Sequence, residues 1–314
     1  MSTVTQVGVA AKGAEQSAVS RGSKLRKYLP RYLSIAPYFI LFLAFGIIPT
    51  IFSFYLALQK WDGIGTMQFV GFSNFAYVFT DSTFGIAVFN TFAIWFMSNV
   101  PMLFIALVLA FLINNRGRSK FLYQIAYYIP SVTSIVAISL VFGSLFGEQY
   151  GLINQSFALL HIPAAQWLTD AWPMRWAISF MYMWRWTGYN ALIYMAGLQS
   201  ILAEYYEAAR LDGANTANTF FRITIPLMRP IILFNVISST IGGLTLFTEP
   251  QVLFGYVNGL GGVGNAGLTM SLYQYSQTFR SEHYGYGAAV SWVIFLITLV
   301  FTIVNWRVIQ RGER

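Results

Sequence analysis

The sequence predicts an all-α membrane protein with six transmembrane helices and both termini in the cytoplasm. Three observations predict this class. Of the 314 residues, 56% are hydrophobic and 10% are charged; six apolar stretches are long enough to span a bilayer; and the basic residues gather on alternate connecting segments. A soluble domain carries about 25% charged residues, so this chain has too few to cover a surface that faces water. Most of its surface is therefore expected to face lipid.

A spanning helix needs about 20 consecutive, mostly apolar residues. The stretches that meet this requirement are 34–58, 88–113, 122–146, 173–197, 230–250 and 287–309. Prolines inside several of them are tolerated because neighbouring helices satisfy the freed backbone groups. The fourth stretch is the least certain of the six because it contains Arg175 and Arg185, and the fifth is short, with Glu249 at its far end.

The distribution of lysine and arginine predicts the orientation, because these residues favour cytoplasmic loops. If the N-terminus is inside, most of the 19 basic residues fall on inside segments, which are the tail, 114–120, 198–228 and the C-terminal end. Lys60 and Arg280 fall on outside segments, and Arg175 and Arg185 lie at or inside the outer half of the fourth span. Both termini are therefore expected to be cytoplasmic.

The chain is expected to divide into a cytoplasmic tail, 1–33, a first transmembrane helix with its outer loop, 34–84, and a transmembrane domain, 85–310. The tail is basic, and the uncharged run that follows it, 32–59, is longer than the apolar core of a cleaved signal peptide. We therefore expect the first helix to be retained.

Composition also argues against several kinds of site. The sequence has no cysteine, which excludes disulfides, thiolate metal sites and cysteine nucleophiles. His161 and His283 are far apart, and neither has a second ligand at metal-binding spacing. The net charge of +8 is spread in short runs beside apolar segments, which does not favour nucleic acid as a partner.

The inside loop 198–228 is the most polar stretch after the tail. Residues 201–211 predict a short amphipathic helix in which Glu204, Glu207 and Arg210 form a polar stripe. The opposite side holds Ile201, Leu202, Tyr205, Ala208 and Ala209.

Gly213 suits the end of that helix, since a glycine adopts positive φ at little cost. Asp212 is a candidate cap for a second short helix through Phe221. A helix–glycine–helix elbow of this kind could fit a groove on another protein; a solvated connector on the membrane surface is the equally open alternative.

These residues also resemble a known family. The run from Glu207 to Ala214, Glu-Ala-Ala-Arg-Leu-Asp-Gly-Ala, with Phe220 or Phe221 and then Ile-Thr-Ile-Pro at 223–226, is similar to the EAA loop of binding-protein-dependent ABC import permeases. Its extended form looks like the carbohydrate-uptake branch, with Ile225 where the family usually has leucine. The resemblance includes 184–201 and in all covers roughly 85–310, with the first helix as the usual N-terminal addition.

The resemblance implies a type I ABC importer permease (MetI-like) fold in the plasma, or inner, membrane. It implies that the loop is a coupling helix docked on a cytoplasmic ATPase. Glu207 would make polar contacts there, Ala208 and Ala209 would permit close approach, and Gly213 would set the elbow. The whole coupling set implied is Glu207, Ala208, Ala209, Asp212, Gly213, Ile223 and Pro226.

The resemblance further implies the partners: a second homologous permease chain, two cytoplasmic ABC ATPase subunits and an extracytoplasmic solute-binding protein. The sequence has no Gly-x-x-x-x-Gly-Lys-Ser/Thr phosphate loop, so ATP and Mg²⁺ are expected on the ATPase subunits. We expect no cofactor in this chain and no enzymatic activity. The cargo implied is a sugar, most simply a di- or oligosaccharide; a non-sugar solute such as a glycerol phosphate or a polyamine is the alternative.

Arg185 is the first candidate for the solute path, because a charge inside a membrane span usually marks function. Its guanidinium could bind sugar hydroxyls while the flanking Trp184 and Trp186 stack on a sugar ring. Alternatively, Arg185 snorkels to the interface and the tryptophans join the aromatic belt. Tyr189 and Asn190 could line a polar path, or Asn190 could hydrogen-bond another helix.

Glu249 is the second candidate, in a segment Phe-x-Glu-Pro that resembles one in disaccharide permeases of this branch. A carboxylate can accept two sugar hydroxyls, and pairing with Arg185 or Arg280 is the alternative. The glycine-rich outer loop 261–267 looks like the family's Gly-Gly-Pro-Gly-Asn-x-Thr segment, with Val263 and Gly267 as departures that leave its contact with a binding protein open.

Other classes fit less well. A membrane enzyme would need a cluster such as His-Glu-x-x-His or paired intramembrane aspartates, and the predicted spans contain no aspartate. A secondary transporter would usually have more spans, internal repeats and coupling-ion ligands near the midplane. A receptor or scaffold would leave the elbow unexplained.

Overall fold

The computed structural model describes residues 28–114, 120–254 and 260–311, and these residues are almost entirely helical. Most of the predicted tail, residues 1–27, lies outside them. The chain divides into two compact units, 1–55 and 56–314. The second unit thus begins inside the segment 34–84 that was assigned to the first helix and its outer loop.

The described part of the first unit lies in one long apolar helix. Tyr28–Ala57 is helical, with a π-helical turn, η1 (Leu43–Ile47), before α2 (Ile48–Ala57). None of its most apolar 18-residue window is buried within the chain. Such a helix is stable only where another apolar medium covers it, as a bilayer does.

The second unit begins with a small hairpin of β1 (Gln59–Lys60) and β2 (Gln68–Phe69), paired antiparallel with Gln59 opposite Phe69. Helix α3 (Ser73–Thr80) follows. The side chain of Asn74 donates hydrogen bonds to the carbonyls of Ala57 and Gln59 at 2.9 and 2.8 Å. This amide fixes the hairpin to the start of α3.

Long helices form the body of the second unit. They are α4 (Ser82–Asn114), α5 (Lys120–Val132), α6 (Ile135–Leu145), the short α7 (Leu152–Leu159) and α8 (Ala171–Leu198). Helices α5 and α6 make one bent pair, with 92° between them. Helices α4 and α5 both pack against α8.

The polar loop and the last third of the chain complete the unit. The elements are α9 (Ala203–Leu211), α10 (Thr216–Thr219), the π-helical turn η3 (Phe220–Thr224), α11 (Ile225–Leu227), α12 (Arg229–Leu244), α13 (Thr248–Phe254), the 3-10 turn η4 (Val263–Asn265), α14 (Met270–Tyr275), the π-helical turn η5 (Ser276–Arg280) and α15 (Tyr284–Arg311).

Each predicted span falls largely on helix, but the third is broken between α5 and α6 and the fifth between α12 and α13. Among the described residues, Tyr28–Ala57, Ser82–Asn114, Arg229–Phe254 and Tyr284–Val308 are long and apolar enough to cross a membrane, and the bent pair α5–α6 makes a fifth if counted as one span. The fourth predicted span is α8, 28 residues long. This helix is not among those long and apolar enough to cross a membrane, and it contains Arg175 and Arg185, as its composition led us to expect.

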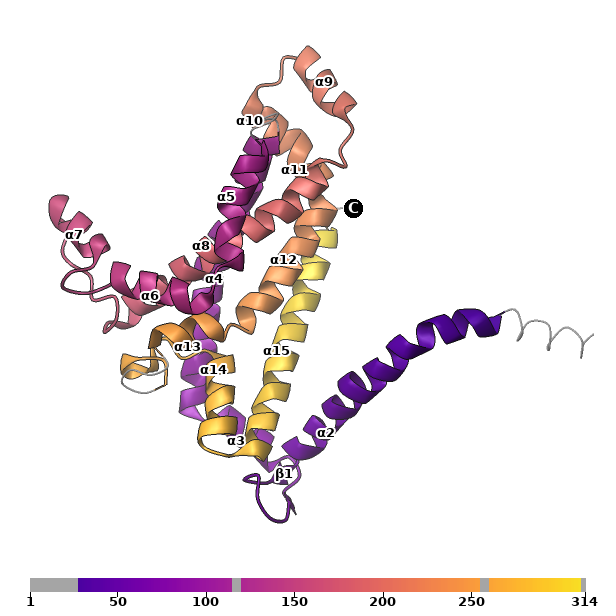
Figure 1. The fold of residues 1–314 in the computed structure, drawn as a ribbon, viewed down its shortest axis with the longest axis vertical. Helices are drawn as coiled ribbons and strands as arrows, with labels where there is room; N and C mark the ends of the chain where they lie inside the picture. The colour runs from indigo at the N-terminus through magenta and orange to yellow at the C-terminus, as the bar shows by residue number, and fades with distance from the viewer. Residues whose placement is uncertain (1–27, 115–119, 255–259, 312–314) are drawn as a thin grey trace, which may run out of the picture. The chain divides into compact units, whose positions relative to one another are not determined.

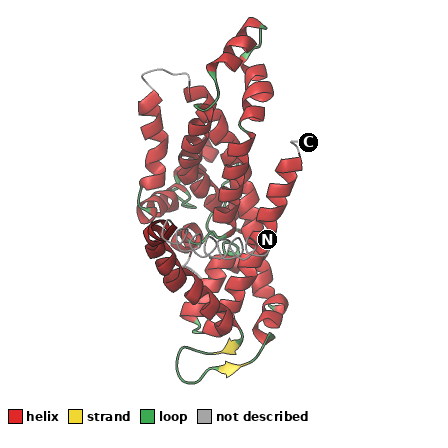
Figure 2. Ribbon diagram, turned by 90° about the vertical axis from the view of Figure 1, so that its right-hand side faces the viewer, coloured by secondary structure: helices red, strands yellow, loops and turns green. Residues whose placement is uncertain are grey.

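The second unit has two distinct ends (Figure 1). The hairpin, α3 and the turn after α14 lie at one end, and α9 to α11 lie at the other, where the described part of α15 also ends. Figure 2 shows the two strands beyond the helices at the first end. We call these the hairpin end and the elbow end. They carry different chemistry.

The core is divided between these ends. Near the hairpin end, Phe84, Tyr273 and Val290 belong to one buried cluster that joins α4, α14 and α15. Near the elbow end, Tyr194 and Phe220 belong to another, which joins α8 to η3. The elbow is thus attached to the end of α8 through a packed apolar base.

Candidate functional site

The elbow between α9 and α10 closes as a Schellman motif. The amide of Ala214 donates to the carbonyl of Ala209 at 2.9 Å, and the amide of Gly213 donates to that of Arg210 at 3.1 Å. Gly213 has φ +77°, a left-handed conformation that favours glycine. The predicted helix and its glycine stop are therefore present.

The second arm of the elbow differs from the prediction. Asp212 is the C-cap of α9. The N-cap of α10 is instead Asn215, whose side chain accepts from the amide of Asn218 at 2.8 Å. The Schellman motif explains the difference: it uses Asp212 to Ala214 to turn the chain, so the next helix starts later. The second arm then continues through η3 and α11 to the start of α12.

One face of α9 points into the chain and the other is uncovered. Ala209 is 5% exposed, and the hydroxyl of Tyr206 lies 3.3 Å from Thr224 Oγ1 in η3. Of the two alanines expected to permit close approach, Ala208 is therefore the one at the surface. The predicted apolar side is divided, because Ala209 faces inward while Leu202 and Tyr205 are exposed.

The uncovered face of the elbow combines charge with apolar side chains. Glu207 and Arg210 are exposed and line a small cavity of about 270 Å³ between α9 and α10. Leu211 is 89% exposed, so this leucine gains nothing from the folded chain itself. Ile223 and Pro226 are half-buried in the second arm. The seven predicted coupling residues thus share the elbow end.

The two solute-path candidates meet inside the helix bundle. Arg185 Nη1 on α8 donates to Glu249 Oε1 on α13 at 3.1 Å, and Trp186 Nε1 donates to the same oxygen at 3.3 Å. Glu249 is 3% exposed. The guanidinium carbon of Arg185 also lies 5.1 Å from the centre of the Trp186 ring. This arrangement is the Arg185–Glu249 pair that was the alternative to a free carboxylate.

The remaining path candidates point in different directions from α8. The ring of Trp184 packs against Phe142 of α6 at 5.6 Å between centroids, and the exposed Tyr189 lies edge-on to Trp186 at 5.8 Å. Asn190 is buried; its Oδ1 accepts from Ser239 Oγ of α12 at 3.0 Å. Asn190 therefore joins two helices, as the helix–helix alternative anticipated.

The structure adds polar residues that the sequence reasoning did not single out. Within the described residues, the Trp95 indole nitrogen, both amide atoms of Asn99 and the Gln251 amide oxygen are buried without a hydrogen-bond partner. Asn99 and Trp95 lie against Gly243, where an added Cβ would come within 2.4 Å of the Asn99 amide nitrogen. The sequence feature that could have revealed Asn99 is a polar residue in the middle of the apolar run of α4.

The other arginine of the predicted fourth span has a different setting. Arg175 Nε donates to Asn90 Oδ1 of α4 at 2.9 Å, and the same amide of Asn90 donates to the carbonyls of Asn265 and Leu268 at 2.7 and 3.0 Å. The glycine-rich loop is therefore tied to α4 and α8. Its earlier glycines at 255 and 259 lie outside the described residues.

Comparison with known proteins identifies the family of this chain. Residues 91–311 match the family described as "Binding-protein-dependent transport system inner membrane component". The lactose transport system permease protein LacF of Rhizobium radiobacter is 37% identical, over 92% of this chain and 97% of that protein. The arabinooligosaccharides transport system permease protein AraP of Bacillus subtilis is 32% identical, over 87% of this chain and 86% of its own.

Two further proteins extend the comparison. The trehalose/maltose transport system permease protein MalF of Thermococcus litoralis is 30% identical, over 91% of this chain and 95% of that protein. A chain from the crystal structure of a bacterial alginate ABC transporter, in complex with a periplasmic protein carrying an alginate pentasaccharide, has the same fold. Its TM-score is 0.75 at 21% identity, over 90% of this chain and 94% of that one. The chain belongs to the family of binding-protein-dependent transport system inner membrane components, that is, to the permease subunits of ABC importers.

Proposed function

We propose that this chain forms half of the translocation path of an ATP-driven importer for a sugar. Family membership makes it a transport component rather than an enzyme. The relatives named for lactose, arabinooligosaccharide and trehalose or maltose transport support a sugar as its cargo. In the importer, six spans cross the plasma membrane, with both termini and the elbow in the cytoplasm.

The uncovered elbow is the observation that carries the coupling role. Leu202, Tyr205 and Leu211 are exposed beside Glu207 and Arg210. All five residues belong to the loop 198–228, which lies between two predicted spans. Exposed apolar residues rimmed by charge are typical of a protein-binding surface. We assign this surface to a cytoplasmic ATPase subunit, one of two, which bind the ATP and Mg²⁺.

The remaining parts of the proposed machine follow from the same role. A second homologous permease chain completes the path, and an extracytoplasmic solute-binding protein delivers the sugar at the hairpin end. ATP binding closes the ATPase pair, the elbow transmits that movement to α8 and α12, and the spans exchange an inward-facing for an outward-facing path. The predicted segments 1–33, 34–84 and 85–310 serve as tail, first span with outer loop, and permease domain.

Uptake by the assembled complex tests the cargo. Vesicles containing both permease chains, the ATPase subunits and the binding protein are supplied with labelled mono- and disaccharides, glycerol 3-phosphate and putrescine. ATP-dependent entry of a sugar is expected. Entry of the phosphate ester or the diamine without any sugar would overturn the sugar assignment.

Gly213→Asp tests the coupling role. A Cβ at Gly213 meets no atom within 4 Å, so the substitution disturbs the elbow rather than a packed core. The variant is expected to insert normally while uptake falls to background. Gly71→Asp is the control, because Gly71 also has positive φ and open space but lies near the hairpin. Wild-type uptake by the Gly213 variant would refute the coupling assignment.

Glu249→Gln tests the solute path. The change keeps the shape of the side chain but removes the charge that faces Arg185, so an altered polar wall should raise the KM for the sugar. Glu148→Gln makes the same change in a residue that bonds Thr169 in the loop before α8. An unchanged KM in the Glu249 variant removes this residue from the path.

A further inference from the structure

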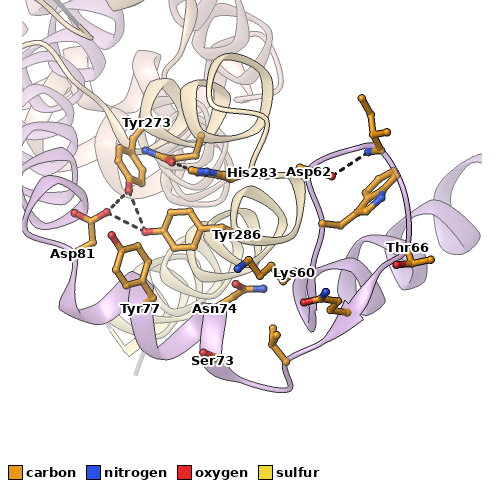
Figure 3. A pocket seen from close by; sticks show the side chains of 15 residues that line it. Lys60, Asp62, Thr66, Ser73, Asn74, Tyr77, Asp81, Tyr273, His283 and Tyr286 are labelled. Atoms are coloured by element: carbon orange, nitrogen blue, oxygen red, sulfur yellow. Dashed lines mark hydrogen bonds between the residues drawn. The ribbon is translucent and has the colours of Figure 1, made fainter.

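The hairpin end contains a cavity that none of the predicted site residues lines. Its volume is about 680 Å³, and its walls come from the hairpin, α3, the α14–η5 segment and the start of α15 (Figure 3). This volume lies within the range of about 300–1,000 Å³ typical of small-molecule sites. All of these elements belong to the second unit.

A charged acceptor forms one side of this cavity. Asp81 Oδ2 accepts from the hydroxyls of Tyr273 and Tyr286, the latter at 3.1 Å, and Asp81 Oδ1 accepts from the amide of Thr83 at 2.8 Å. Burial alone would raise the pKa of Asp81, but the hydrogen bonds from Tyr273, Thr83 and Tyr286 outweigh it and lower that pKa. The carboxylate therefore stays ionised and its position is fixed.

Aromatic rings supply the apolar part of the wall. The Trp61 ring lies 5.5 Å from that of Tyr284, and its indole nitrogen donates to the carbonyl of Gly65 at 3.3 Å, which holds it in the hairpin. Tyr77 lies 5.1 Å from Tyr286, edge to face. Rings held in this way offer flat apolar surface at little cost in conformational entropy.

Several exposed polar side chains around the cavity have unused hydrogen-bonding capacity. In the part of the chain that the structure describes, Lys60, Gln68, Ser73 and Tyr77 make no side-chain hydrogen bond to protein. Figure 3 shows the rings of Tyr77 and Tyr286 between Asp81 and Lys60. These groups offer both donors and acceptors to a ligand.

The charges around the cavity select among ligands. Two carboxylates, Asp62 and Asp81, and one ammonium group, Lys60, line the cavity, so a phosphate ester or an acidic sugar would meet net repulsion. Aromatic faces beside dispersed donors and acceptors match a ring that has both C–H faces and hydroxyls. We propose that this cavity binds a neutral saccharide of one or two rings, at a site separate from the Arg185–Glu249 pair.

Hydrogen bonds connect the cavity to the segment that carries Glu249 of the Arg185–Glu249 pair. The hydroxyl of Thr269, which caps α14, donates to the carbonyl of Leu246 at 2.7 Å, and the next amide, that of Met270, donates to Thr91 Oγ1 at 2.9 Å. Leu246 lies just before α13, which carries Glu249, and α14 carries Tyr273 to the cavity. The outer site holds sugar at the entrance to the path, a role that rests on the proposed import function.

Binding to the assembled transporter in nanodiscs, without its binding protein, tests the proposal. The probes are labelled lactose and trehalose, with glucose 6-phosphate as the anionic comparison. Saturable binding of at least one disaccharide is expected, and weaker binding of the phosphate. Tyr77→Phe and Gln68→Ala should each weaken disaccharide binding about 3- to 10-fold, the loss expected for one hydrogen bond. Tyr275→Phe, the same change outside the cavity, should leave it unaltered.

Three outcomes overturn the proposal. One is the lack of saturable disaccharide binding. Another is binding that Glu249→Gln abolishes and the cavity variants leave intact, which would place the sugar in the inner path. The third is seen when the solute-binding protein is added in a second assay: cavity variants that weaken only its association would make the cavity a docking site for protein. Sugar uptake is measured in parallel: uptake without cavity binding overturns this inference alone, and cavity binding without uptake of any sugar overturns the import function.

Discussion

Two glycines, one at each end of the second unit, are required for different reasons. At the elbow, Gly213 provides positive φ in open space; at the hairpin end, a Cβ on Gly285 would lie 1.9 Å from the carbonyl oxygen of Gln59. The hairpin end is closed by contacts between distant segments, such as the Tyr286–Asp81 hydrogen bond. The elbow leaves Leu211 uncovered. The hairpin end is held together by contacts within this chain, whereas at the elbow the apolar side chain of Leu211 lies uncovered among the described residues.

The largest effect on stability is expected from Gly285→Ala. The added methyl group must displace backbone rather than a flexible side chain, and overpacking of this kind costs about 1–3 kcal/mol. Thermal unfolding of the purified protein in detergent measures the loss. Gly85→Ala is the matched control, since its Cβ meets nothing within 4 Å near the start of α4. Equal melting temperatures for the two variants would contradict the closed hairpin end.

A smaller effect, dependent on pH, is expected from Asp81→Asn. Because Asp81 is partly exposed, we expect a cost of about 1 kcal/mol at neutral pH, below the usual value for bonds to a charged group. The pKa of Asp81 is lowered on folding from 3.8, so its contribution is present above that pH and is lost as the pH falls through the lowered pKa. The melting temperatures of wild type and variant should therefore converge in acid. A gap that stays constant from neutral to strongly acidic pH would argue against an ionised acceptor.

At the elbow, Asn215→Ala should act locally. Losing an N-cap costs about 1 kcal/mol, but α10 is a single turn on an exposed arm, so global unfolding should change less than this. Faster amide hydrogen exchange at residues 216–219 is the expected sign. Asn218→Ala removes a neighbouring exposed side chain and keeps the cap. Identical amide exchange rates in both variants would show that the Asn215 cap does not stabilise α10.

The smallest change in stability is expected from Leu211→Ser, which should leave the melting temperature unaltered because the side chain is exposed. If an ATPase subunit covers this leucine, its removal costs about 1.5 kcal/mol or more of binding, roughly tenfold in affinity. Retention of the ATPase during purification measures it. Leu159→Ser on α7 changes a similarly exposed leucine away from the elbow. Equal retention by both variants would leave the elbow end without an apolar contact.

The sequence predicts the local features of this fold well and the contacts between segments less well. Apolar runs and the Gly213 stop depend on neighbouring residues, so the helices and the elbow could be placed. The sharp bend between α5 and α6 and the cap at Asn215 depend on how the chain packs and turns. Which face of α9 is inward depends on the contact between Tyr206 and Thr224 of η3, which lie 18 residues apart in the sequence.

The same distinction applies to the sites. The Arg185–Glu249 pair was foreseen as an alternative, because two opposite charges in apolar spans have few other partners. The hairpin cavity was not foreseen, because Asp81, Tyr273 and Tyr286 each look like ordinary residues at the end of a helix. Separation along the chain conceals such a site until the segments are brought together.

The hydrogen bonds of Asn90 also imply an order in which segments of the chain come together during synthesis. This amide bonds Arg175, 85 residues later, and the carbonyl of Leu268, 178 residues later. At about 5–20 residues per second, a ribosome needs roughly ten to thirty seconds to supply the second partner after α4 has entered the membrane. During that interval Arg175 can satisfy Asn90, and the outer loop joins last. A nascent chain halted before α13 would therefore already hold α4 against α8, before the loop that carries Asn265 and Leu268 has been made.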